Sequence, residues 1–112
     1  MSLRLEKKWT DLTQTSISSL PGQLGVYQLA EPDGSIFYIG YAGGHSLFGL
    51  RSELQRWLEK RAGRPVRFRY EVNMQYTTRH QELLMLYVAD HGNLPAENTD
   101  VNIKQLGRLN PG

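Results

Sequence analysis

Two short tyrosine-containing triplets are the first feature of the sequence that suggests chemistry. Gly25-Val26-Tyr27 and Tyr38-Ile39-Gly40 are separated by ten residues, and the Asp33-Gly34 dipeptide between them is typical of a hairpin turn. A hairpin closed there pairs Tyr27 with Gly40. The two phenols then lie on one sheet face as diagonal neighbours, roughly 7–8 Å apart between Cα atoms.

Such a tyrosine pair has two interpretations. Paired strand tyrosines usually pack in a core with their hydroxyls at its rim. The strand-ending Gly40, however, permits close approach of a ligand, and the Gly43-Gly44 loop next to it offers unhindered amides. These glycines favour a cavity for a phosphate.

Phosphodiester hydrolysis also needs charge neutralisation and help for the leaving oxygen, usually from a divalent ion. Glu82 is the candidate ligand because it opens an otherwise apolar helical stretch, where a carboxylate needs a metal ion or another partner. An exposed first-turn glutamate that favours the helix dipole is the alternative. A single carboxylate predicts one Mg²⁺ or Mn²⁺ ion rather than a two-metal site.

Basic residues are concentrated between Arg51 and Arg69, where six arginines and Lys60 face only two glutamates. Arg51 falls early in a predicted helix, where its guanidinium can grip two phosphate oxygens; a surface ion pair with Glu53 is the alternative. A solvated helix face is the other interpretation of the whole basic stretch. The predicted nucleic-acid-binding residues are Gly40, Arg56, Arg61, Arg64, Arg67 and Arg69.

Taken together, the two triplets, Arg51, Glu82 and an asparagine beyond Pro95 form an ordered pattern that resembles the GIY-YIG nuclease family over about residues 21 to 98. The resemblance implies hydrolysis with one metal ion. Its implied roles are water orientation or deprotonation by Tyr27, a hydrogen bond from Tyr38, phosphate stabilisation by Arg51, metal binding by Glu82 and backbone support by Asn98. As a base, Tyr27 needs a lowered pKa, which nearby cations could supply.

Two departures from the family pattern bear on activity. Gln55 stands where the family commonly has a histidine or tyrosine, and glutamine cannot ionise. The loop between Gly40 and Arg51 is longer than in compact members and introduces His45, which either substitutes for the missing group or is an ordinary loop histidine.

Hydrophobic periodicity predicts the elements that must position these residues. We expect strands over 25–31, 36–39 and 66–74. One helix should run from about Leu47 to Lys60 with Ser46 as its cap, and a second from Arg79 to His91 behind a Thr78-Gln81 capping box. The predicted class is α/β (α+β): a small three-stranded antiparallel or mixed sheet flanked by helices, in the order β-β-α-β-α.

The 112 residues predict one domain. We expect a polar N-terminal arm over 1–20, the GIY-YIG-like domain over 21–98 and a tail over 99–112 that packs on it or trails it. The absence of cysteine excludes disulfides, zinc-thiolate sites and a cysteine nucleophile. Without an apolar span or leader, the sequence predicts a soluble, cytoplasmic protein that does not bind membranes.

The leading functional hypothesis is a metal-dependent endonuclease, with DNA preferred to RNA as substrate. A second hypothesis, supported by Gln55, is a module of the same fold that binds nucleic acid but cuts poorly or not at all. A third is a protein-interaction domain with a tyrosine-rich groove. Family members usually gain specificity from an attached recognition domain. We therefore expect specificity here to come from a second copy or a partner protein, or from recognition of nucleic-acid structure rather than sequence.

Overall fold

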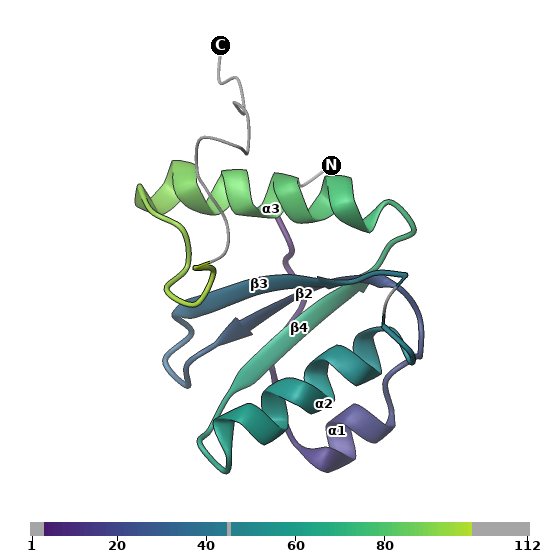
Figure 1. Cartoon of the computed structure of the whole chain (residues 1–112). Coiled ribbons are helices and arrows are strands. Elements are labelled where there is room, and N and C mark those ends of the chain that lie inside the picture. The colour runs from purple at the N-terminus through teal and green to yellow at the C-terminus, as the bar shows by residue number, and fades with distance from the viewer. Residues whose placement is uncertain (1–3, 45, 100–112) are drawn as a thin grey trace.

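A four-stranded antiparallel sheet separates two helical layers in the computed structural model, which describes residues 4–44 and 46–99 (Figure 1). The strand order is β1-β4-β2-β3. Helices α1 and α2 cover one face, and α3 covers the other (Figure 1). The elements are β1 (Thr10–Asp11), α1 (Gln14–Ser18), β2 (Gly25–Ala30), β3 (Ile36–Ala42), α2 (Leu50–Arg61), β4 (Arg67–Val72) and α3 (Tyr76–His91).

The mixed α+β class is confirmed, but the sheet has four strands rather than three, and every described pairing is antiparallel. The additional strand β1 and helix α1 come from the predicted polar arm. Leu12, Ile17 and Leu20 of this stretch are buried in the core beneath α2. A five-residue helix carries too little periodicity to be recognised. Its signal is the capping box between Thr13 and Ser16.

Both longer helices begin at residues other than those predicted. Helix α2 begins at Leu50, because Gly49 adopts a φ of 58° before it and Ser46 bonds elsewhere. A Cβ on Gly49 would lie 2.3 Å from the Gln23 carbonyl oxygen, so only glycine fits this turn. Helix α3 begins at Tyr76, which places Thr78 inside it and makes the predicted capping box wrong.

The hairpin has the predicted register, with Tyr27 paired to Gly40 and Leu29 to Tyr38. The two tyrosine ring centroids lie 6.0 Å apart in the layer that faces α2. A Cβ on Gly40 would lie 2.5 Å from both tyrosine side chains. The space beside Gly40 is therefore filled by the tyrosines, and the expectation that this glycine leaves room for a ligand is wrong.

The outer edge of β3 is covered by the segment after α3. The buried Asn98 side chain accepts a hydrogen bond from Ile39 N–H and donates one to Ile39 C=O, both at 2.9 Å. One residue earlier, the Glu97 N–H donates to Phe37 C=O at 2.8 Å. The segment thus satisfies part of an otherwise open edge, through one backbone bond and one side-chain amide.

We predict that Gly40→Ala destabilises the domain, because the added methyl group overlaps two buried rings. Overpacking of this kind costs about 1–3 kcal/mol. Gly44→Ala is the matched control, since a Cβ there meets nothing within 4 Å. Urea denaturation followed by circular dichroism measures both variants; equal midpoints would contradict the packing role of Gly40.

We also predict that Asn98→Ala lowers the free energy of unfolding by about 1–3 kcal/mol, because it leaves the Ile39 N–H buried without an acceptor. The Ile39 carbonyl keeps a contact with His80 Nε2 at 3.0 Å, so the loss falls mainly on the amide. Asn93→Ala, in the exposed loop nearby, should leave the unfolding midpoint unchanged.

Candidate nucleic-acid interface

The hydroxyl group of Tyr27 lies inside the core, where it must find an acceptor. Tyr27 is 0% exposed, and its phenol donates to Glu53 Oε1 at 3.3 Å. Burial, followed by the neighbouring Tyr38 and Glu53, raises the pKa of the Tyr27 phenol. It therefore stays protonated at neutral pH and can donate a hydrogen bond, but it is not arranged to act as a base.

Glu53 is the residue that the sequence interpretation missed. Besides Tyr27, its carboxylate accepts from Ser46 Oγ at 2.8 Å and pairs with Arg56 Nη2 at 3.2 Å. Glu53 had been considered only as a partner for Arg51. The available signal was helical spacing, because Glu53 and Trp57 are four residues apart and so share one face of α2.

A cavity of about 420 Å³ opens beside this hydrogen-bonded group. Tyr38 and Trp57 form its aromatic wall, with ring centroids 4.7 Å apart. The Arg56 side chain is 72% exposed, and Lys60 Nζ lies 4.4 Å from the centroid of the Trp57 ring. The lining residues are Tyr38, Arg56, Trp57, Lys60, Glu97 and Thr99.

Two of the predicted site residues face α1 rather than the tyrosines. Arg51 Nη2 donates to the Leu20 carbonyl oxygen at 2.8 Å. The side-chain amides of Gln55 and Gln14 bond reciprocally at 2.9 and 3.2 Å. Arg51 and Gln55 are four residues apart and share a helix face. Together they hold α1 and the loop that follows it against α2.

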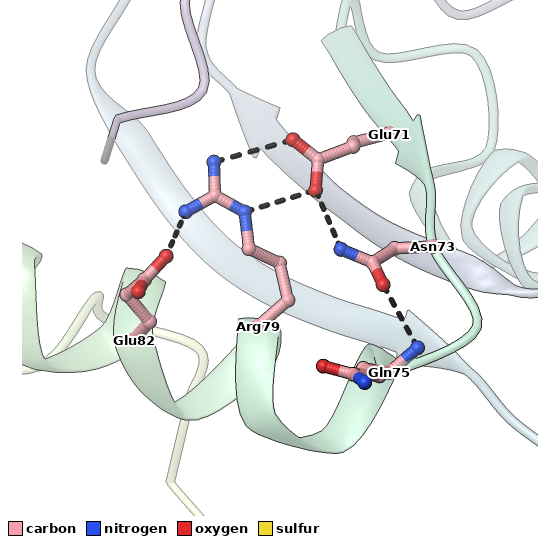
Figure 2. A network of polar contacts seen from close by, with 5 residues as sticks. All are labelled: Glu71, Asn73, Gln75, Arg79 and Glu82. Atoms are coloured by element: carbon pink, nitrogen blue, oxygen red, sulfur yellow. Dashed lines mark hydrogen bonds and ion pairs between the residues drawn. The ribbon is translucent and has the colours of Figure 1, made fainter. Parts of the chain in front are cut away.

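Glu82 belongs to a polar network in the layer on the other side of the sheet (Figure 2). Arg79 is clamped between two carboxylates: it binds Glu71 through Nε at 2.9 Å and Nη2 at 3.2 Å, and it donates to Glu82 through Nη1. Asn73 adds a hydrogen bond to Glu71 at 3.0 Å, and its own carbonyl oxygen accepts from the Gln75 N–H.

The one cation of this network, Arg79, stabilises the charged form of its carboxylate partner Glu71 and is stabilised in turn. Burial raises the pKa of the Glu71 carboxyl, but hydrogen bonds from Arg79 and Asn73 and the charge of Arg79 outweigh burial and lower it. Burial lowers the pKa of Arg79, and its two carboxylate partners outweigh that effect and raise it. Because the Glu82 carboxylate already accepts from a cation and lies in the layer opposite Tyr27, it does not fit as the ligand of a Mg²⁺ or Mn²⁺ ion serving the tyrosines.

The predicted arginine surface is divided by the fold. The Arg61 guanidinium lies over Phe37 at 3.9 Å and pairs with Glu31 at 3.6 Å. That of Arg69 packs on Trp9 at 4.1 Å and donates to Gln28 at 2.7 Å. These two arginines, like Gly40, are used for packing.

The other predicted arginines keep exposed positions. Arg56 is at the cavity, Arg64 is exposed at the end of α2, and Arg67 is exposed on β4 with Asp11 at 3.8 Å. Asn98 supports the β3 backbone as expected, and His45 lies outside the described residues. The predicted set therefore converges only in part: Tyr27, Tyr38 and Arg56 come together, whereas Arg51, Gln55 and Glu82 lie elsewhere.

Comparisons with known proteins give a family but no activity. Neither the curated proteins nor the solved structures contain a match to this chain. Within residues 4–44 and 46–99, no helix is long and apolar enough to cross a membrane. One family model, described as a domain of unknown function (DUF7508), matches residues 1–90. Because that match spans most of the sequence, the chain belongs to the DUF7508 family.

Proposed function

We propose that this domain binds nucleic acid at the cavity between α2, β3 and residues 95–99, as a GIY-YIG-like module. The observation that carries the proposal is the lining of one cavity by two cations and two aromatic rings. Arg56 and Lys60 are one helical turn apart on α2, a spacing that lets both reach the same phosphate backbone.

The chemistry of the cavity matches that of a nucleotide chain. Arg56 spends one N–H group on Glu53 and retains further donors for phosphate oxygens. Tyr38 and Trp57 offer an apolar wall against which a base can pack, a contact worth about 1–3 kcal/mol for each stacked base.

Binding is favoured over hydrolysis because the groups expected to cut are committed to other partners. The Tyr27 phenol is buried, protonated and bonded to Glu53. Glu82 is bonded to Arg79 on the other side of the sheet. Arg51 and Gln55 hold α1.

We predict that the wild-type domain binds fluorescently labelled DNA oligonucleotides with an affinity that falls steeply with salt, as measured by anisotropy. Each of Arg56→Ala and Lys60→Ala should weaken binding and reduce the slope of log affinity against log salt by about one. Arg4→Ala is the matched control: it removes the same charge from an exposed ion pair with Asp90, on the α3 side. Binding of equal strength by all four proteins would overturn the proposal.

Hydrolysis of the bound strand is the second candidate function. The observation in its favour is that Tyr38 lines the cavity, with Tyr27 and the Glu53 carboxylate behind it. If the domain does cut, the group that carries the reaction is either Glu53 or Glu82.

We predict that incubation of single-stranded, duplex and branched DNA with the wild-type domain and Mg²⁺ or Mn²⁺ leaves the DNA intact. Cleavage that survives Glu82→Gln but is lost in Glu53→Gln would move the assignment to hydrolysis at the cavity. Loss of cleavage in Glu82→Gln alone would instead restore the metal role predicted for that residue. Circular dichroism of both variants checks that each remains folded.

A further inference from the structure

We infer that the cavity selects an unpaired guanine base, which it recognises through the carboxylate of Glu97. This inference rests on the proposed function, since it names the base that the nucleic-acid site prefers. It depends on a residue that phosphate binding does not require, because an acidic group in the lining of a phosphate site repels the phosphate chain.

Glu97 is held firmly at the cavity by its backbone. Its N–H donates to Phe37 C=O at 2.8 Å, and the following residue, Asn98, makes two hydrogen bonds to Ile39. The segment that carries the carboxylate is therefore fixed to the edge of β3 at Phe37 and Ile39, the two residues that flank Tyr38. Recognition groups on such anchored backbone keep their geometry when the ligand arrives.

The Glu97 carboxylate is also available for a ligand. It accepts no hydrogen bond and joins no ion pair with another side chain in the part of the chain that the structure describes, although Arg56 and Lys60 line the same cavity. An ionised carboxylate accepts hydrogen bonds only, and its two oxygens are spaced for a pair of adjacent donors.

Guanine is the nucleic-acid base that presents two adjacent donors on its Watson–Crick edge, N1–H and the N2 amino group. Adenine and cytosine each present one amino group beside an acceptor, and thymine or uracil presents one N–H between two carbonyl oxygens. A carboxylate therefore pairs fully with guanine and meets at least one repelling acceptor on every other base. Because that edge is occupied in a duplex, the guanine must be unpaired.

The remaining lining suits the rest of such a nucleotide. Tyr38 and Trp57 provide the wall for the purine ring, and Arg56 and Lys60 on α2 provide positive charge for the flanking phosphates. The volume of about 420 Å³ falls in the range of roughly 300–1,000 Å³ that small-molecule sites occupy. The cavity is thus of a size to accept a single base, with the neighbouring nucleotides outside it.

The test is anisotropy with the full chain and single-stranded oligothymidines that differ only in one central base: guanine, inosine, adenine, cytosine or thymine. The wild type should bind the guanine strand about tenfold more tightly than the thymine strand. Inosine keeps N1–H but lacks the N2 amino group, so its strand should lose most of that preference. Glu97→Gln should bind all five strands within about twofold of one another and retain the salt dependence. Glu59→Gln, which removes the same charge from α2 outside the cavity lining, should keep the guanine preference.

The outcomes separate this inference from the function on which it rests. Equal, salt-sensitive binding of all five strands by the wild type, or an unchanged guanine preference in Glu97→Gln, would overturn guanine selection and leave nucleic-acid binding in place. Failure of every strand to bind, even at low salt, would overturn the proposed function as well.

Discussion

The buried hydroxyl group of Tyr27 imposes the constraint on which the α2 side of the domain depends. A phenol that is wholly removed from water needs an acceptor, and the acceptor here is a carboxylate on the first turn of α2. A partly buried carboxylate needs donors in turn, and Glu53 obtains them from Ser46 and Arg56. These hydrogen bonds fix how α2 lies on the sheet. They also fix the turn of helix that carries Arg56, Trp57 and Lys60, and so place the wall of the cavity.

Partly buried polar side chains are satisfied by different arrangements on the two faces of the sheet. On the α2 side a phenol, a hydroxyl and a guanidinium share one carboxylate, and the last of these remains largely exposed. On the α3 side two carboxylates share Arg79, whose side chain is only 10% exposed. The first arrangement leaves positive charge open to a ligand. The second holds its one cation between two carboxylates from different elements, which suits a role in joining β4 to α3 (Figure 2).

The edge of β3 links the stability of the sheet to its candidate function. An open edge strand invites pairing with another chain, and here Asn98 and the Glu97 N–H occupy part of that edge. The segment that protects the edge is also the segment that brings the Glu97 side chain to the cavity. Edge protection and placement of a recognition group are therefore achieved by the same hydrogen bonds.

By itself, the sequence determined the features that are local. The turn at Asp33-Gly34 and strand alternation were enough to predict the register that pairs Tyr27 with Gly40, and periodicity was enough to predict β2, β3, β4 and the two long helices. Only the tertiary structure decided which face of α2 meets the tyrosines. That face carries Glu53 and Arg56, whereas Arg51 and Gln55 turn toward α1, a helix too short to be read from its pattern. Arg69 looked available in the sequence because its partner, Gln28, becomes a neighbour only when β4 pairs with β2. Glu82 and Arg79 are three residues apart on α3, so helical spacing could have revealed that pair, but Glu71, which completes the network, comes from β4. Spacing along the chain specifies a residue's element and helix face, but the neighbour that satisfies its charge is chosen by the packing of elements distant in sequence.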